Sequence, residues 1–210
     1  MAMDIALTVL DALRERARAT LSHGRYTHTL GVERCVCRLG ERLLPEAIPA
    51  LRAAALLHDI TKEYTPEEHR ALCEAFGISL PEEALSMPAL MHAFTAPLYI
   101  RRELPSLACE PILSAIACHT VGRADMTLFD KILFVADYVE DGRTYPACVA
   151  VRLHLFASLS DAAQDAQRSL DEATLAALEN TVSALLSRGK PISVETVMAR
   201  NALLGRIYRD

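Results

Sequence analysis

The sequence predicts an all-α protein built as one helical bundle. Half of the residues (51%) are hydrophobic, which is enough for a substantial core in a chain of 210 residues. Alanine and leucine dominate over β-branched residues, and this composition favours helices. Apolar residues also recur with helical spacing, and no segment shows a convincing strand pattern.

Helix boundaries are predicted from residues that begin and end helices. The expected helices cover residues 4–21, 26–44, 50–58, 66–77, 89–103, 111–119, 128–140, 161–187 and 194–208. Ser22-His23-Gly24 is expected to separate the first two helices, and Pro45 to end the second. Thr65, followed by proline and two glutamates, is expected to cap the fourth.

The second half of the chain has its own boundary residues. Pro97 is expected to lie inside a helix, with a kink as one outcome. Thr127 and Ser193 are expected to cap helices, and the long helix is expected to end at Arg188-Gly189-Lys190-Pro191. From Cys148 onward, two or three helices are expected. The whole chain, 1–210, is predicted to be a single domain, with a metal-binding core over about 20–145 and C-terminal helices over about 148–210 packed on it.

Composition excludes several classes of protein. The formal net charge of −5 argues against broad binding to nucleic acid. No run reaches the ~18 apolar residues that span a bilayer, and the N-terminal segment does not resemble a signal peptide. The six cysteines form no C-x-x-C pair and are expected to be small buried residues in a reducing compartment. We therefore expect a cytoplasmic protein that binds neither membrane nor nucleic acid.

Four histidines and two aspartates lie where polar side chains are costly. Each sits inside or at the end of an apolar helical run, such as LRAAALLHD or KILFVAD. An unpaired polar group in such surroundings costs several kcal/mol. The six residues are His28, His58, Asp59, His92, His119 and Asp137.

A shared metal centre would pair all six residues. Imidazole and carboxylate together suit divalent iron, manganese or zinc. Neighbouring residues on a helix point about 100° apart. The His58 ring can therefore bind one ion while the two oxygens of Asp59 reach a second, so that six ligands from separate helices hold two ions.

A core role for the histidines is the competing interpretation. A single buried histidine usually hydrogen-bonds a backbone carbonyl, and a His-Asp pair occurs often by chance. His23, His69 and His154 lie in polar or loop surroundings and are expected not to bind metal. The order H…HD…H…H…D, with each member on a different expected helix, favours the metal centre.

The order His28, His58-Asp59, Asp137 resembles the HD-domain superfamily of metal-dependent phosphohydrolases. Longer segments resemble the bacterial YqeK family of symmetrical bis(5′-nucleosyl)-tetraphosphatases. They are RYTHTLGVE, ALLHDITK, MHAFTAP, AIACHTVGRADMTLFDKILFVADYVEDGR and TVMARNALL. The resemblance runs from about Arg25 to the C-terminus. One departure is Asp141, which stands where proline is expected, outside the ligand set.

This resemblance implies an all-α HD fold with two divalent ions, iron first and manganese or zinc as alternatives. It implies that one ion is held by His28, His58, Asp59 and Asp137, and the second by Asp59, His92 and His119. The implied activity is hydrolysis of diadenosine tetraphosphate and related dinucleoside polyphosphates at the middle of the phosphate chain. Metal-activated hydroxide would attack, and ADP would leave.

Basic residues near the ligands in the sequence are expected to bind substrate phosphates, because guanidinium and ammonium groups match phosphate oxygens. They are Arg25, Lys62, Arg123, Lys131 and Arg143. Lys62, Arg123 and Lys131 are expected, with Asp59, to be catalytic. Each could instead be an ordinary surface charge, and Lys131 could neutralise a neighbouring aspartate. No phosphate-binding glycine loop and no G-x-S-x-G motif is present.

Other functions remain open from the residues alone. A different HD-type phosphohydrolase, acting on nucleoside monophosphates or a cyclic nucleotide, would use the same ligands. A nucleotide-binding HD module without turnover and a plain helical scaffold are further alternatives. A homodimer is also left open.

Overall fold

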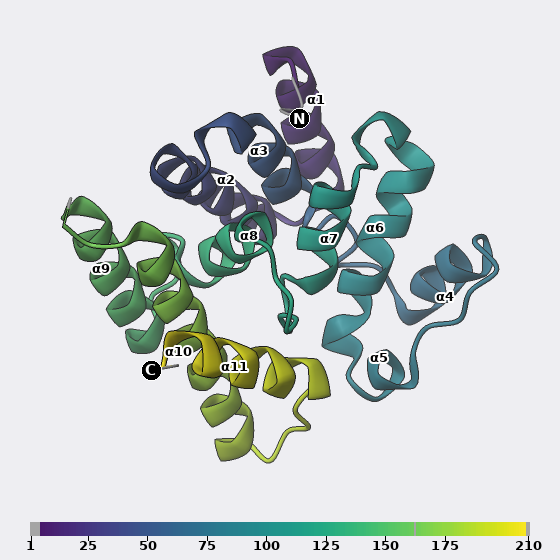
Figure 1. Cartoon of the computed structure of the whole chain (residues 1–210). Coiled ribbons are helices and arrows are strands. Elements are labelled where there is room, and N and C mark those ends of the chain that lie inside the picture. The colour runs from purple at the N-terminus through teal and green to yellow at the C-terminus, as the bar shows by residue number, and fades with distance from the viewer. Residues whose placement is uncertain (1–4, 162, 209–210) are drawn as a thin grey trace.

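The computed structural model describes residues 5–161 and 163–208, and every regular element in that part of the chain is a helix (Figure 1). The α-helices are α1 (Leu7–Thr20), α2 (His23–Leu43), α3 (Ile48–Leu57), α4 (Pro66–Glu74), α5 (Glu82–Ser86), α6 (Met91–Glu103), α7 (Glu110–Cys118), α8 (Leu128–Val139), α9 (Pro146–Ser160), α10 (Ala166–Ser187) and α11 (Val194–Ile207). Short 3-10 turns are η1 (Pro45–Ala47), η2 (Pro88–Leu90) and η3 (Pro105–Leu107). The prediction of an all-α protein is confirmed.

Helix α8 lies at the centre of the molecule and packs against α2, α7 and α10 (Figure 1). Its buried positions lie on several sides because neighbours surround it. A capping box fixes its start: the Thr127 hydroxyl accepts from Asp130 N, and the Asp130 carboxylate accepts from Thr127 N. Asp137 is thereby held in the last turn of a buried, well-anchored helix.

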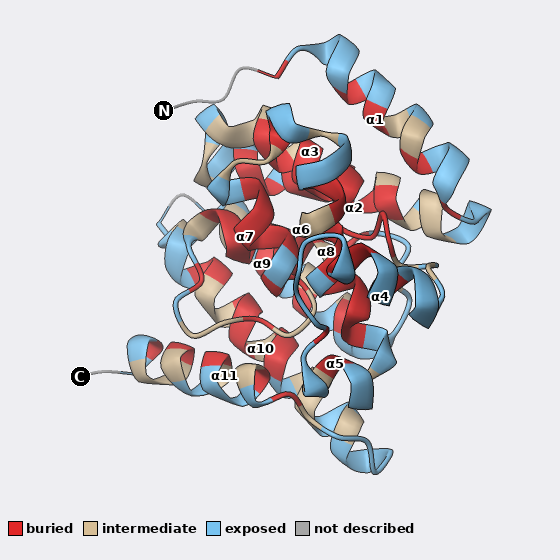
Figure 2. Cartoon of the chain, turned by 90° about the vertical axis from the view of Figure 1, so that its right-hand side faces the viewer, coloured by how far each residue is buried: buried red, intermediate tan, exposed pale blue. Residues whose placement is uncertain are grey.

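Helix α3 is nearly buried, as Figure 2 shows for this part of the molecule. It packs mainly on α2, and its small alanines allow close approach. The helix ends at Leu57, so that His58 and Asp59 follow in a buried turn at its C-terminal end. The sequence therefore brings a histidine and an aspartate into the interior on a rigid apolar support.

The last three helices pack onto this core. Helix α10 packs against α8 and α9, and α11 packs against α10. The loop after α7 reaches them at Gly122, whose positive φ of 76° suits glycine and whose Cβ position lies 3.2 Å from both Ala199 and Leu178 side chains. One hydrophobic cluster includes residues from α1 to α11. The division into a metal-binding core and C-terminal helices of a single domain stays a prediction. None of the described helices is both long and apolar enough to cross a membrane.

Two predicted helix starts are wrong, and the predicted fourth helix ends at Glu74 instead of residue 77. Helix α2 begins at His23, not at residue 26, because the chain turns at extended Leu21 and Ser22, and Tyr26 N donates to Ser22 O at 2.8 Å. The long helix α10 begins at Ala166 instead of residue 161. Its start is fixed by the Asp165 carboxylate, which accepts from two backbone N–H groups.

Three smaller differences concern helix ends. The short helix α5 was not predicted. Ser193 precedes α11 as expected, but its hydroxyl makes no capping hydrogen bond. Helix α6 continues across Pro97. The predicted start of the first helix at Asp4 lies outside the described residues.

Candidate metal centre and active site

Four imidazole rings lie in a row among the central helices. The ring centroids of His28 and His58 are 5.5 Å apart, those of His58 and His119 are 5.0 Å apart, and those of His119 and His92 are 5.0 Å apart. The rings come from α2, from the ends of α3 and α7, and from the start of α6. The fold thus brings together the four histidines that the sequence singled out.

Hydrogen bonds orient three of these rings. The Nδ1 atom of His58 lies 2.7 Å from Ala55 O, and that of His119 lies 2.6 Å from Ile116 O. A carbonyl can only accept, so each Nδ1 carries the proton and each Nε2 keeps a free lone pair. The Nδ1 atom of His28 lies 3.1 Å from Glu140 Oε1, and this contact orients the third ring.

Asp59 lies between the two ends of the histidine row. Its Oδ2 is 3.4 Å from His58 Nε2 and 4.0 Å from His28 Nε2. Its Oδ1 is 3.2 Å from His92 Nε2 and 3.7 Å from His119 Nε2. Each carboxylate oxygen therefore faces a different pair of rings.

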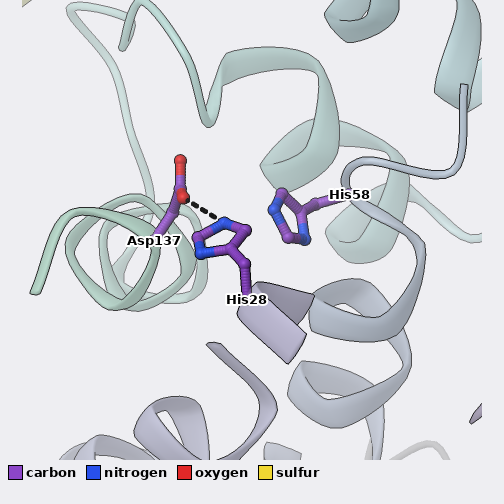
Figure 3. A group of neighbouring side chains, drawn as sticks. All are labelled: His28, His58 and Asp137. Atoms are coloured by element: carbon purple, nitrogen blue, oxygen red, sulfur yellow. Dashed lines mark ion pairs between the residues drawn. The ribbon is translucent and has the colours of Figure 1, made fainter. Parts of the chain in front are cut away.

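Asp137 completes the end of the row that contains His28. Figure 3 shows His28, His58 and Asp137 converging from different elements. The His28 Nε2 atom lies 2.9 Å from Asp137 Oδ1. Burial disfavours the charged form of His28, but Asp137 and Glu140 outweigh it and raise its pKa. The ring thus sits between two carboxylates, one on each of its nitrogens.

This donor set fits divalent metal ions. The Nε2 atoms of His28 and His58 are buried. They face carboxylate oxygens of Asp137 and Asp59 respectively, but neither makes a hydrogen bond of normal geometry in the described structure, and a buried polar atom without such a bond is costly. One atom from each of His28, His58 and Asp137, and likewise from His58, Asp59 and His119, lie within 4.8 Å of one another. Ligands bind such ions at about 2.0–2.2 Å, so atoms at this spacing can share one ion after small adjustments. The clusters could therefore hold metal.

The charge states of Asp59 and His92 also suit metal binding. Burial disfavours the charged form of Asp59, but His58, His119 and Lys62 hold its pKa well below the ordinary value. Burial, with His119 and Lys62, lowers the pKa of His92 to about 2. A charged carboxylate and a neutral imidazole are the forms that bind metal.

A polar cavity of about 260 Å³ opens onto this cluster. Its lining includes three candidate ligands, Asp59, His119 and Asp137, and three basic residues, Arg25, Lys62 and Arg143. A second polar cavity, of about 340 Å³, also contains Arg25 and Arg143 in its lining. The two cavities thus meet at these arginines.

The basic side chains contact the cluster directly. Arg25 Nη1 donates to Asp59 Oδ2 at 2.8 Å, and Arg143 Nη2 donates to Asp137 Oδ1 at 2.7 Å. Lys62 Nζ lies 3.1 Å from His92 Nε2. These three of the five predicted phosphate-binding residues lie at the cavity.

The other two basic residues lie elsewhere. The guanidinium of Arg123 contacts Asp125, Ser114 Oγ at 3.0 Å and Asp130 at 3.6 Å. Lys131 is 6% exposed and pairs with Asp171 on α10. Neither residue lines the cavity that opens onto the metal cluster. The structure therefore does not bring Arg123 and Lys131 to the candidate site.

Two residues at the site were missed by the sequence analysis. Glu140 contacts His28, and its position three residues after Asp137 could have signalled this, since such residues share a helix face. Thr120 Oγ1 lies 3.1 Å from His119 Nε2 and 3.2 Å from His92 Nε2. Apart from its place next to His119, nothing in the sequence pointed to Thr120.

Comparisons with known proteins show the family of the chain. The HD domain family model matches residues 25–142, a range that contains every candidate ligand. A Halalkalibacterium halodurans protein named bis(5′-nucleosyl)-tetraphosphatase, symmetrical, is 32% identical over 184 residues, which cover 88% of this chain and 91% of that protein. A Bacillus subtilis protein of the same name is 31% identical over 185 residues, with the same coverage of 88% and 91%.

A solved structure supports the fold. A Clostridium acetobutylicum protein described as a predicted HD superfamily hydrolase involved in NAD metabolism superposes with a TM-score of 0.79 at 28% identity, over 93% of this chain and 97% of that one. The fold and the histidine–aspartate cluster thus define a hydrolase of the HD-domain class. The chain belongs to the YqeK-type family of symmetrical bis(5′-nucleosyl)-tetraphosphatases, as its motifs predicted.

Proposed function

We propose that this hydrolase cleaves diadenosine tetraphosphate and related dinucleoside polyphosphates at the middle of the phosphate chain, giving ADP. The observation that carries the proposal is Asp59, whose two oxygens face different histidine pairs beside a cavity lined by basic residues. The names of the relatives from two organisms support the choice of substrate.

Two divalent ions form part of the proposal. His28, His58, Asp59 and Asp137 would hold one ion, and Asp59, His92 and His119 the other, with iron as the proposed metal. The unpartnered Nε2 atoms and the place of Asp59 between the rings support this division. When bound, such ions activate water for attack and neutralise charge that develops on the phosphoryl group.

The chain's own residues bind and orient the phosphates. Arg25 and Arg143 each use one guanidinium nitrogen on a carboxylate, which leaves further N–H donors for phosphate oxygens. Lys62 adds a compact positive charge at the other end of the cluster. Arg123 and Lys131 have no part in this arrangement, because other acidic residues hold their side chains away from the cavity.

Product analysis tests the proposal. The iron-loaded protein is incubated with diadenosine tetraphosphate, and the products are separated by anion exchange. Asp59→Ala is tested alongside, with Asp11→Ala as a matched control, since Asp11 is exposed on α1. ADP as the sole product, lost in Asp59→Ala and kept in Asp11→Ala, is the expected result.

Two outcomes would overturn parts of the proposal. AMP together with ATP would refute cleavage at the middle of the chain while keeping the metal site. No turnover by the metal-loaded wild type would refute the activity and leave another HD-type nucleotide phosphohydrolase, or a binding module, as the alternative. A cytoplasmic location, the absence of nucleic-acid binding and the formation of a homodimer stay predictions.

A further inference from the structure

We propose that an apolar cavity beside the polar one is the subsite for one nucleobase of the substrate, and that the Ser193 hydroxyl hydrogen-bonds the edge of that base. The identity of the ligand rests on the proposed function. The subsite itself rests on the shape, lining and position of the cavity.

The cavity has a volume of about 480 Å³, within the roughly 300–1,000 Å³ of small-molecule sites. One wall is Met87 with η2 (Pro88–Leu90), a second is the loop after α7, and a third is α10 with the start of α11. Most of the exposed lining is apolar. Lys190 supplies positive charge at the rim, where it is exposed.

This cavity adjoins the phosphate-binding region. Thr120 and Thr181 line both the apolar cavity and the polar one. The Thr120 hydroxyl lies 3.1 Å from His119 Nε2, so the apolar cavity begins one side chain away from the candidate metal cluster. A molecule held by its phosphates in the polar cavity can therefore extend its other end into the apolar one.

Ser193 is a buried polar residue in the lining of this apolar space, and its covered Oγ reaches a bound base after a rotation of the side chain. The residue is 3% exposed, it lines the cavity, and its Oγ has no hydrogen-bond partner in the described structure. It stands at the N-cap of α11, where a serine oxygen ordinarily accepts from a backbone N–H, yet it makes no such bond. A buried hydroxyl can both donate and accept, which suits the mixed polar edge of a base.

The chemistry of the lining favours a base over a further phosphate group. A phosphate needs several donors or positive charges, and these lie in the polar cavity instead. Met87, Leu185 and Pro191 offer apolar faces that suit a flat heteroaromatic ring. The two cavities together thus match one half of the substrate, with the phosphates in the first and the base in the second.

Binding measurements with ADP and with pyrophosphate test the subsite. The protein is loaded with manganese and freed of excess ion, and each ligand is titrated by calorimetry. Ala89→Trp places a large ring in the cavity from an exposed position, and Ser193→Ala removes the hydroxyl. The controls are Ala184→Trp and Ser187→Ala, which change exposed residues of α10 outside the cavity lining.

The proposal predicts a loss that is specific for the nucleotide. Ala89→Trp should weaken ADP binding by about tenfold or more, because the added ring occupies the space of the base. Ser193→Ala should weaken it by about 3- to 10-fold, the usual effect of one hydrogen bond. Pyrophosphate binding and the two control variants should be unchanged.

Unchanged ADP binding in Ala89→Trp, or equal weakening of ADP and pyrophosphate, would overturn the subsite. The result is separable from the proposed activity. Suppose that the wild type fails to release ADP from diadenosine tetraphosphate, while Ala89→Trp weakens the binding of ADP and not of pyrophosphate. The cleavage proposal then fails and the subsite stands. If ADP is released but Ala89→Trp does not selectively weaken ADP binding, the subsite fails and the cleavage proposal stands.

Discussion

Gly31→Ala is predicted to destabilise the protein, although glycine to alanine inside a helix usually stabilises. Gly31 lies in α2, three residues after His28, and faces Glu140 at the end of α8. A Cβ atom at this position would lie 2.2 Å from Glu140 Oε2 and 2.9 Å from its Cδ. Such contacts are too close, so the Glu140 carboxylate must move.

The cost follows from what the carboxylate holds. Glu140 is 4% exposed, and it accepts from His28 Nδ1 at 3.1 Å and from Gly142 N at 2.7 Å. Hydrogen bonds to charged groups contribute about 1.5–3 kcal/mol each, whereas the helix gains about 1 kcal/mol from alanine. Loss of both bonds gives a net decrease of about 2–5 kcal/mol in the free energy of unfolding. Since Glu140 also orients His28, metal affinity should fall by about 10- to 100-fold.

Two measurements check this expectation. Denaturant unfolding of the metal-free protein gives the change in stability, and competition with a chelator gives the metal affinity. Gly24→Ala is the matched control in the same helix, because no atom lies within 4 Å of its Cβ position. It should stabilise by up to about 1 kcal/mol.

A double-mutant cycle decides whether Glu140 is the cause. In a Glu140→Ala background the obstruction is gone, so Gly31→Ala should become stabilising. If Gly31→Ala destabilises equally in both backgrounds, or has no effect in the wild type, the reasoning from this contact is refuted.

The remaining predictions concern Asp59, Lys131 and His69. Asp59→Asn should retain at most one metal ion by elemental analysis, because one of the two carboxylate oxygens is lost; two retained ions would contradict its shared role. Lys131→Ala leaves the largely buried Asp171 without its partner and should lower the free energy of unfolding by about 3 kcal/mol, with KM unchanged. A large rise in KM would show that Lys131 contacts the substrate. His69→Gln should keep the metal content and lose about 1 kcal/mol with the bond to Thr95. Burial holds the pKa of His69 below its ordinary value, so as pH falls below about 6.5 the unfolded chain takes up the proton first and stability drops. Between pH 7 and about 5, the melting temperature of His69→Gln should therefore fall less than that of the wild type. An equal fall in both proteins would argue against this role of His69.

Two helix starts were predictable because a threonine and the acidic residue three positions later form a capping box. Thr65 and Thr127 both form capping boxes, and both starts are confirmed. The start of α2 was misplaced because Gly24 was interpreted as a break, whereas it lies inside the first turn of that helix. A glycine signals a permitted turn, and only the packing around it decides whether the chain uses one.

The candidate ligands were predictable because apolar context makes a lone polar side chain conspicuous. The basic residues were less predictable, because distance along the sequence says little about direction. Lys131 precedes Asp137 by six residues, which places it on another side of α8 at about 100° per residue, toward α10. Arg123 follows Gly122, whose turn directs the guanidinium toward Ser114 and Asp130.

The apolar cavity was beyond prediction for a different reason. Its walls come from three segments far apart in the chain, around Pro88, Thr120 and Ser193, and no local pattern marks any of them. Only the packing of α10 and α11 onto the core brings these segments together.

The candidate metal ligands and one wall of the apolar cavity lie in two consecutive segments of the chain. The HD domain match ends at residue 142, before α9, whereas one wall of the apolar cavity belongs to α10 and α11. Every candidate metal ligand therefore precedes the short link before α9. The wall of the apolar cavity that α10 and α11 form follows this link. Recombination between relatives at that link would exchange the downstream wall and leave the ligand set intact. If the apolar cavity is the base subsite, such an exchange would change which nucleotide fits while every candidate metal ligand is kept.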